Sequence, residues 1–312
     1  MKDILTLTMN PTIDRSCTIE HVVPERKLRC SRPDQEPGGG GLNVTRAIKN
    51  LGGRSEALYV RGGPTGIMLG DLLEKEGIRH RPVETRGWTR ENLIVLESST
   101  GQQYRFGLPG PELKESEWRQ VLDMVKGLSP DMAFLVASGS LPPGVPVDFH
   151  ARVARITRDM DVRLIIDTSG EPLSAALEEG GIFLVKPNIG ELREIARAQF
   201  GSEEEIIGYA EKLIQKEKVK VVVISLGSAG SLLVTRKGCR KLRAPTVSIR
   251  SKVGAGDSMV AGIALSLARG NPIEDAALFG IAAGAAAVMT PGTELCRRED
   301  TERLYEQLGM AS

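Results

Sequence analysis

The sequence predicts an α/β fold: a mostly parallel β-sheet covered by helices on both faces, with a small β-sheet lid. Two observations predict the main sheet. Short β-branched runs alternate with longer amphipathic segments, and the runs are mostly apolar, as in strands buried on both faces. A third observation predicts the lid, because two strand-like stretches with polar faces interrupt this alternation.

The predicted strands and helices of the main layer follow one another in chain order. The strands are Ile4–Thr8, Ala57–Val60, Ala133–Ala137, Leu164–Asp167, Phe183–Val185 and Val219–Ser225. The helical patterns between them are Val44–Leu51, Met68–Glu76, Glu115–Val125, Val147–Met160 and Glu203–Lys216. Parallel strands joined by right-handed crossovers leave a ligand crevice at their carboxyl ends, so we expect the functional residues just after strands.

The lid is predicted from Thr18–Arg29 and Asn92–Phe106, the second of which contains a hairpin turn at residues 99–101. Because no covering helix follows either stretch, we expect two insertions, about 15–36 and 88–108, on one α/β core spanning residues 1–312. A lid of this kind has one apolar face to hide, and pairing with a second copy would cover it. The alternative is an extra antiparallel edge of the main sheet.

The C-terminal part adds a predicted strand, Val247–Ile249, and two apolar helices, Asp257–Arg269 and Ile273–Met289. The uncharged run from Ala276 to Met289 is shorter than the about 20 residues that a membrane helix needs. It predicts a buried helix and no membrane association.

Charge and cysteine usage narrow the class of protein. The 41 Lys and Arg residues nearly cancel the 40 Asp and Glu residues, so no bulk basic field would collect nucleic acid or an anionic membrane. The four cysteines are widely spaced with no C-x-x-C pair, which argues against a zinc site or a secreted disulfide framework. Because Asn10, Pro11 and Asp14 interrupt any apolar signal segment, we expect a cytoplasmic protein.

Gly254-Ala255-Gly256-Asp257 is the strongest chemical signal, because it follows a predicted strand and opens a helix. Amides at a helix N-terminus converge on an anion. A carboxylate beside them can take a proton from an attacking hydroxyl while the amides stabilise a transferred phosphoryl group. The structural alternative is an Asp N-cap preceded by ordinary turn glycines.

A glycine-rich segment, Pro37 to Asn43, carries the second signal. Four consecutive glycines before a helix allow the backbone to approach a ligand closely, although a flexible surface turn would also use them. Asn43 favours the ligand interpretation, because its amide stands at the start of the helix.

Two further segments could bind a nucleotide and its metal. Lys186-Pro187-Asn188-Ile189-Gly190-Glu191 follows a strand, and Asn188 and Glu191 have capping-box spacing. At a sheet edge the same oxygens can hold waters around Mg²⁺. The loop 225–230 is a glycine hairpin that could equally wrap a nucleotide.

Three charged residues complete the candidates. Asp14 follows the first strand and could hold sugar hydroxyls, or satisfy its own turn. Arg90 and Arg105 lie on or beside the predicted lid, where guanidinium groups could fork onto a substrate phosphate; the alternative is solvated surface arginines. The G-x-x-x-x-G-K-[ST], G-x-G-x-x-G and G-x-S-x-G motifs are all absent from the sequence.

Together these motifs resemble the phosphofructokinase-B family of the ribokinase superfamily, from Leu5 to Cys296. The Gly-Gly-Gly-Gly-x-Asn-Val segment and Val253-Gly254-Ala255-Gly256-Asp257-Ser258 occur in the family's order. Within the family the chain is most similar to the bacterial minor-isoform 6-phosphofructokinases. The segments that carry this likeness are Lys27-Leu28-Arg29-Cys30, Glu36-Pro37-Gly38, Trp88-Thr89-Arg90, Gln103-Tyr104-Arg105-Phe106 and Ser138 to Gly144.

The resemblance implies a ribokinase-like fold and a role for each candidate residue. Asp257 would be the base and Gly254, Ala255 and Gly256, with Asp257, the anion hole. Asp14, Gly39, Gly40 and Asn43 would hold the sugar, and Arg90, Arg105, Ser140 and Lys27 its phosphate. Lys186, Asn188, Ser225, Gly227 and Gly230 would line the Mg-ATP site, with Glu191 and Asn188 organising Mg²⁺. Ser251, Val253, Ala287 and Gly292 would match the family's K⁺ site, and the lid would pair two subunits into a homodimer.

The implied reaction is ATP-dependent phosphorylation of fructose 6-phosphate to fructose 1,6-bisphosphate in glycolysis. Tagatose 6-phosphate and fructose 1-phosphate are alternative acceptors, and a non-catalytic sugar-phosphate sensor is a further alternative. The chain departs from its close relatives at Gly190, where they carry a basic residue, and at Thr290 and Glu294, where Asn and Arg are expected. These departures bear on nucleotide and cation binding and leave Asp257 untouched.

Overall fold

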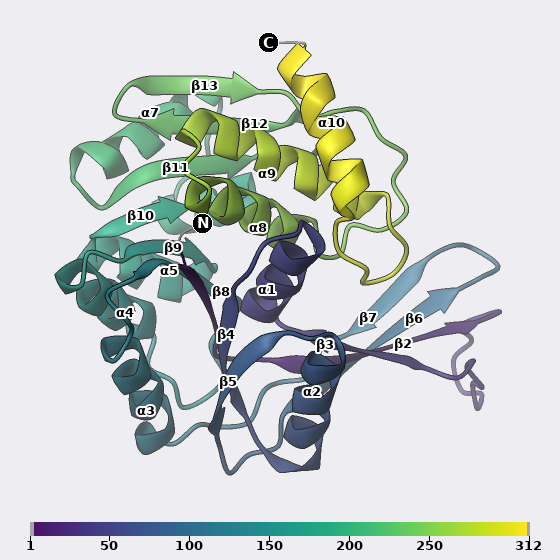
Figure 1. The fold of residues 1–312 in the computed structure, drawn as a ribbon. Coiled ribbons are helices and arrows are strands. Elements are labelled where there is room, and N and C mark those ends of the chain that lie inside the picture. Colours follow the sequence, from purple (N-terminus) through teal and green to yellow (C-terminus); the bar gives the residue numbers. More distant parts are fainter. Residues whose placement is uncertain (1–2, 311–312) are drawn as a thin grey trace.

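Two β-sheets organise the computed structural model, which describes residues 3–310 (Figure 1). The larger sheet has the strand order β13-β12-β11-β10-β9-β8-β1-β4-β5. Its strands are β1 (Asp3–Thr8), β4 (Glu56–Arg61), β5 (Arg79–Glu84), β8 (Met132–Ser138), β9 (Arg163–Asp167), β10 (Ile182–Val185), β11 (Val219–Ser225), β12 (Ser231–Thr235) and β13 (Gly238–Leu242). The strands from β5 to β11 are parallel, and β12 and β13 extend the sheet antiparallel.

The structure confirms each predicted strand up to Val219–Ser225. Two strands of this sheet, β5 and β13, were not predicted, and both lie at its outer edges. β12 is the segment Ser231–Thr235 that the loop 225–230 was expected to join to β11. Edge strands are half-solvated, so their polar sequences carry little of the apolar signal that marks a buried strand.

Helices cover both faces of this sheet (Figure 1). They are α1 (Gly40–Asn50), α2 (Gly63–Lys75), α3 (Glu115–Lys126), α4 (Phe149–Asp159), α5 (Gly170–Glu179), α6 (Ile189–Ala196), α7 (Glu203–Gln215), α8 (Ala255–Ala268), α9 (Ile273–Val288) and α10 (Arg298–Met310). Alternate residues of one strand serve opposite faces: Leu5 and Leu7 pack with α3 to α7, whereas Ile4 packs with α1 and α8 to α10. The mostly parallel, doubly covered sheet is therefore confirmed.

The second sheet has the order β3-β2-β6-β7 and stands apart from the first, which excludes the alternative of an extra edge on the main sheet. Its strands are β2 (Thr12–Ile19), β3 (Asp34–Gly38), β6 (Arg90–Glu97) and β7 (Gln103–Phe106). The predicted hairpin between residues 92 and 106 is confirmed as β6 and β7. We call this sheet the lid sheet. It projects from the body of the molecule in Figure 1.

Two predicted strands are wrong. The strand expected at Thr18–Arg29 is instead β2, which ends at Ile19, and residues 20–33 form an irregular segment. The strand expected at Val247–Ile249 is an irregular connection in which Ile249 is 59% exposed. The β-branched residues there gave a strand signal, but β13 already closes that edge of the sheet, and no neighbouring strand pairs with the segment.

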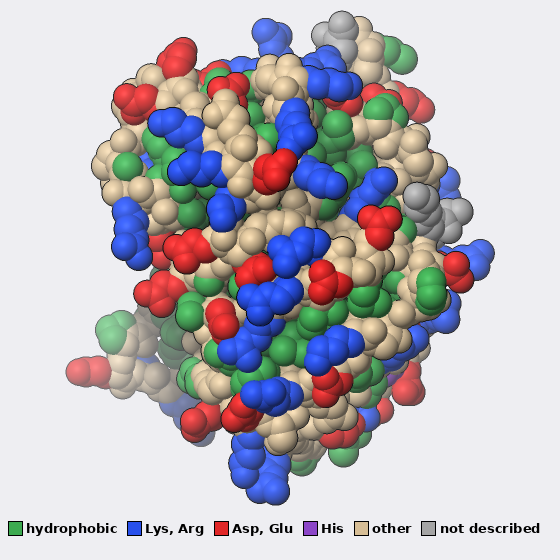
Figure 2. All heavy atoms as spheres, turned by 90° about the vertical axis from the view of Figure 1, so that its left-hand side faces the viewer, with side chains coloured by type: hydrophobic (Ala, Val, Ile, Leu, Met, Phe, Trp, Pro, Cys, Tyr) green, Lys and Arg blue, Asp and Glu red, His purple; other side chains and the backbone are tan. Residues whose placement is uncertain are grey.

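The surface carries both signs of charge, as the composition predicts. Figure 2 shows Lys and Arg side chains interspersed with Asp and Glu side chains over one whole face, without a single-sign field. Within residues 3–310, no helix combines the length and apolar character needed to span a bilayer.

Candidate active site

The predicted site residues gather where β1, β8, β9 and β10 end and α1 and α8 begin. A Cβ on Gly40 would lie 2.4 Å from Ser138 Oγ, and one on Gly41 would lie 2.5 Å from the Leu7 carbonyl oxygen. The glycine-rich segment is therefore packed directly on the strand ends and is not a flexible surface turn. This packing also explains why α1 begins at Gly40, four residues before the predicted start.

Asp257 lies in the first turn of α8, and its Oδ2 accepts a hydrogen bond of 2.8 Å from Asn43 Nδ2. The N-cap of α8 is Gly254, with φ of 74°, so Asp257 is not the N-cap that the structural alternative supposed. Burial, followed by the negative charge of Asp167, raises the pKa of Asp257 to about 6, although Asn43 and Lys186 oppose the shift. The carboxylate is therefore a better proton acceptor than an ordinary Asp.

The start of α8 offers free backbone donors beside this carboxylate. The first intrahelical bond runs from Ser258 N to Gly254 O at 2.8 Å, so the amides of residues 255–257 have no partner within the helix. Gly254 needs its positive φ, and a Cβ there would also lie 2.6 Å from Leu295 Cδ2. The free amides that the predicted anion site requires are thus present, although an irregular segment precedes them where a strand was expected.

Lys186 and Asp167 form a buried ion pair beside the same amides. Lys186 Nζ lies 3.2 Å from Asp167 Oδ1, and both side chains are largely buried. Burial alone would lower the pKa of Lys186, but Asp167, with weaker effects from Glu191 and Asp257, raises it on balance. The lysine stays charged, and its Nζ would be 3.5 Å from a Cβ on Gly256, which places a cation next to these free amides.

On the lid side, Asp14 Oδ1 accepts from Asn92 Nδ2 at 2.9 Å across the parallel pair of β2 and β6. Burial raises the pKa of Asp14, against the hydrogen bond from Asn92 and the charges of Arg90 and Arg105. Arg105 is exposed and Arg90 is half-buried. Both arginines lie on the same face of the lid sheet as Asp14, because Asp14 pairs with Asn92 and Arg105 pairs with Ile94, two residues further along β6.

Arg90 joins the lid sheet to the core. Its Nη1 donates to the Leu108 carbonyl at 3.0 Å and its Nη2 to the Asn10 carbonyl at 3.1 Å. Asn10 Nδ2 in turn donates to Ser140 Oγ at 3.0 Å. Two buried atoms of this cluster, Arg90 Nε and Asn10 Oδ1, have no hydrogen-bond partner. A ligand presenting an anionic oxygen and a hydroxyl would satisfy both.

Lys27 is the predicted ligand that the structure does not bring into this cluster. It lies exposed in the irregular segment 20–33, and no hydrogen bond or ion pair of the described residues joins it to the other candidates. Lys27 lies in a segment without regular structure, and a sequence motif does not determine the conformation of such a segment.

The two predicted nucleotide segments lie side by side. Ser225 N donates to the Pro187 carbonyl at 3.0 Å, and Asn188 forms a bridge with Ser225. The loop between β11 and β12 is closed by a bond of 2.8 Å from Leu226 N to Gly230 O, with Gly227 and Gly230 at positive φ. Lys186, Asn188, Ser225, Gly227 and Gly230 therefore form one continuous edge of the crevice.

Asn188 and Glu191 form the capping box of α6. Glu191 Oε2 accepts from Asn188 N, and Asn188 Oδ1 accepts from Glu191 N, both at 2.9 Å. No hydrogen bond within residues 3–310 involves Glu191 Oε1, and one such oxygen fits Mg²⁺, which keeps most of its waters. Among the described residues no three His, Cys, Asp or Glu side chains gather around a metal site. The structural and the metal interpretations are thus compatible.

The residues of the predicted monovalent-cation site also meet. Ser251 Oγ donates to the Gly292 carbonyl at 2.6 Å and accepts from Val253 N at 3.2 Å. Thr290 Oγ1 contacts the carbonyls of Ala287 and Glu294 at 2.7 and 2.6 Å. Carbonyl oxygens are suitable ligands for K⁺, and Thr290, one of the sequence's departures, supports this loop from within.

Three residues of the site were missed by the sequence interpretation: Asp167, Asn92 and Asn10. Asp167 ends a predicted strand and Asn92 begins a predicted lid stretch, so their positions were known but their partners were not. Only the structure shows that Asp167 pairs with Lys186, that Asn92 holds Asp14, and that Asn10 bridges Ser140 and Arg90.

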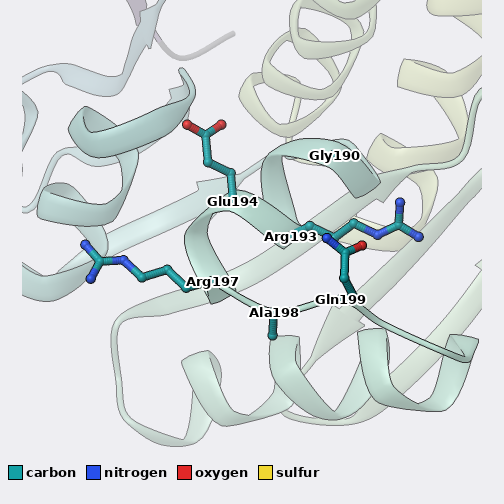
Figure 3. A pocket seen from close by; sticks show the side chains of 6 residues that line it. All are labelled: Gly190, Arg193, Glu194, Arg197, Ala198 and Gln199. Carbon is teal, nitrogen blue, oxygen red and sulfur yellow. The ribbon is translucent and has the colours of Figure 1, made fainter.

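A surface hollow of about 470 Å³ lies beside α6 and the residues that follow it. Its lining residues are Gly190, Arg193, Glu194, Arg197, Ala198 and Gln199. Figure 3 shows the side chains of Arg193, Arg197 and Glu194 pointing in different directions, so they do not converge on one ligand. This hollow therefore offers no convergent set of ligands.

Comparison with known proteins agrees with this geometry. The profile described as pfkB family carbohydrate kinase matches residues 7–300. The ATP-dependent 6-phosphofructokinase isozyme 2 of Mycobacterium tuberculosis is 45% identical over 97% of this chain and 89% of its own length, and that of Escherichia coli is 42% identical over 99% of both. A 1-phosphofructokinase of Borreliella burgdorferi is 32% identical over 98% of this chain and 97% of its own length. The chain belongs to the pfkB family of carbohydrate kinases.

Solved structures give the same result. The Escherichia coli phosphofructokinase-2 in complex with potassium superposes with a TM-score of 0.95 at 42% identity, over 99% of this chain and all of that one. The same enzyme in complex with fructose-6-phosphate gives 0.93 at 41% identity, with the same coverage. Its tetrameric inhibited form also gives 0.93 at 41% identity, again with the same coverage. The predicted ribokinase-like fold is confirmed.

Proposed function

We propose that this protein is an ATP-dependent 6-phosphofructokinase that transfers the γ-phosphoryl group of ATP to the C1 hydroxyl of fructose 6-phosphate. The observation that carries the proposal is the Asp257 carboxylate, held by Asn43 beside the free amides of α8 and next to Lys186. Phosphoryl transfer depends mainly on positioning and electrostatic stabilisation, and this arrangement provides both.

The residues of the core would act on the transferring group. Asp257 accepts the proton of the attacking hydroxyl, and Asn43 fixes the carboxylate through Oδ2. The amides of residues 255–257 stabilise charge on the phosphoryl group as it moves, and Lys186, kept charged by Asp167, holds the nucleotide's phosphates. Bound Mg²⁺, organised by Glu191 and Asn188, would neutralise phosphate charge.

The residues of the lid side would select the acceptor. Asp14, Gly39, Gly40 and Asn43 hold sugar hydroxyls, and Arg90, Arg105 and Ser140 hold the phosphate. The unpartnered Arg90 Nε and Asn10 Oδ1 support a ligand with both an anion and a hydroxyl. Lys27 remains a candidate phosphate ligand that would need its segment to move inward.

Among the acceptors, fructose 6-phosphate is favoured over fructose 1-phosphate because the 6-phosphofructokinases are 42% and 45% identical, against 32% for a 1-phosphofructokinase. A non-catalytic sensor is disfavoured by the intact site around Asp257. Comparing kcat/KM on fructose 6-phosphate, tagatose 6-phosphate and fructose 1-phosphate tests the assignment. Preference for either of the other two acceptors would contradict it, and ligand binding without ADP release in every assay would favour a sensor.

The lid sheet would pair two copies into a homodimer. Leu93 and Phe106 pair directly across β6 and β7, so they share one face of the lid sheet, and they are 40% and 51% exposed in the single chain. A second lid sheet on this face would bury both, and replacing Leu93 with Glu would then yield monomers in light scattering.

We also propose a K⁺ site formed by Ser251, Val253, Ala287 and Gly292, because these residues meet around backbone carbonyl oxygens. Comparing activity in K⁺ and tetramethylammonium buffers tests it.

A further inference from the structure

Asn10 lies between two residues that the proposed function assigns to the acceptor's phosphate, so this inference rests on that function. The residue is buried, 8% exposed, and follows β1 by two positions. Its Nδ2 donates to Ser140 Oγ at 3.0 Å, and its backbone carbonyl accepts from Arg90 Nη2 at 3.1 Å. One residue of the core thus fixes a hydroxyl from the loop after β8 and a guanidinium group from the lid sheet.

The connection that leaves the lid sheet encloses Asn10 from another side. A Cβ on Gly110 would lie only 2.2 Å from Asn10 Oδ1. Nearby, the Leu108 carbonyl accepts the second bond from Arg90, at 3.0 Å. The Asn10 carboxamide therefore fills the space that a side chain at position 110 would take. Through this contact, the segment that follows β7 packs against the core.

The cluster has one unpartnered acceptor, Asn10 Oδ1, and one unpartnered donor, Arg90 Nε, both buried. Leaving such groups unsatisfied costs free energy, so they indicate a site that a ligand completes. The Asn10 side chain holds Ser140, and the bond from Arg90 reaches the backbone carbonyl of Asn10, so the side chain sets the position of Ser140 relative to Arg90.

We propose that Asn10 is a positioning residue for the acceptor's phosphate, which aligns Ser140 and Arg90 on the same anion. Asn10→Ala should raise KM for fructose 6-phosphate about 2- to 10-fold, the loss of the one side-chain hydrogen bond to Ser140, because the bond from Arg90 goes to the backbone carbonyl and remains. KM for ATP and kcat should be nearly unchanged. Asn10→Asp keeps the shape but places a carboxylate beside the anion, so its KM should rise more than that of the Ala variant. A purely structural role predicts the opposite order.

Gly110→Ala provides a second route, because the added Cβ displaces the carboxamide while Asn10 remains. It should reproduce the rise in KM. Asn50→Ala, at an exposed asparagine at the end of α1, is the matched control and should leave both constants unchanged.

Thermal-shift titration with fructose 6-phosphate measures the same affinity without turnover. A wild-type protein that binds fructose 6-phosphate but makes no ADP would contradict the proposed function while leaving the Asn10 inference open to the affinity comparison. Unchanged affinity in both Asn10→Ala and Gly110→Ala, or a milder effect of Asp than of Ala, would overturn the inference.

Discussion

The Asp257 pocket and the lid sheet differ in how firmly their residues are held. α8, which carries Asp257, is buried from Ser258 to Ala268 in a core shared with α1, α9 and the main sheet. The apolar cluster of the lid sheet is only Cys17, Ile19 and Val95 with two partly buried neighbours. The chemical groups are thus fixed by packing, whereas the acceptor groups depend on a few hydrogen bonds. We expect core changes to alter kcat and lid changes to alter KM.

The largest effect is expected at the base. Asp257→Asn should lower kcat about 10²- to 10⁴-fold, because the general base is removed, while KM for both substrates stays close to the wild-type value. Steady-state kinetics with ADP detection measures it. Retained turnover in this variant would show that Asp257 is not the general base. It would also contradict the expectation that core changes alter kcat whereas lid changes alter KM.

The next effect is expected at the buried ion pair. Lys186→Ala should raise KM for ATP and also destabilise the fold by about 3–5 kcal/mol, because Asp167 would remain buried without its partner. Denaturant unfolding checks the second part. The double variant Lys186→Ala, Asp167→Asn should recover much of the stability and none of the nucleotide affinity. A full recovery of affinity would show that Lys186 does not bind ATP.

A smaller effect is expected on the lid side. Arg105→Ala should raise KM for fructose 6-phosphate about 10- to 100-fold, the value of a hydrogen bond to a charged group, with kcat little changed. Arg90→Ala should do the same and additionally loosen the lid, because its bonds to Asn10 and Leu108 are lost. A drop in kcat equal to the rise in KM would mean that lid and core act as one unit.

The pH dependence sharpens the contrast further. Because the pKa of Asp257 is raised to about 6, kcat/KM should fall as the pH drops below about 6, and Asn43→Ala, which removes a bond to the carboxylate, should move this limb to higher pH. Lid variants such as Arg105→Ala should leave the limb in place. An acid limb near pH 4 in the wild type would contradict the raised pKa.

The smallest effect is on stability. A carboxyl group whose folded pKa is raised favours the folded state when protonated, so this contribution is present below about pH 4 and is lost as the pH rises through about 6. Asp257→Asn should therefore be more stable than the wild type at pH 8, by up to about 3 kcal/mol, and equally stable near pH 4. Urea unfolding at the two pH values measures it. Equal stability of Asp257→Asn and the wild type at pH 8 would contradict the raised pKa of Asp257.

The sequence predicted the regular parts of the fold well, because apolar periodicity is strongest where strands are buried on both sides. It failed at Thr18–Arg29 and Val247–Ile249, where β-branched residues lie in segments that no neighbouring strand pairs with. It also missed β5, β13 and, in the lid sheet, β3, because all three are edge strands whose polar sequences carry little apolar signal. A local sequence pattern therefore predicts a strand reliably only where apolar neighbours cover both faces of that strand.

By itself, the sequence determined which residue types stand after each strand: the glycines that permit close backbone approach, the Asp at the start of a helix, and the capping-box spacing of Asn188 and Glu191. Those are properties of short segments, set by local backbone geometry. The tertiary structure alone decided the pairings of Asn43 with Asp257, Lys186 with Asp167 and Asn10 with Ser140. These contacts join positions far apart in the chain, and only the packing of helices on the sheet brings them within hydrogen-bonding distance.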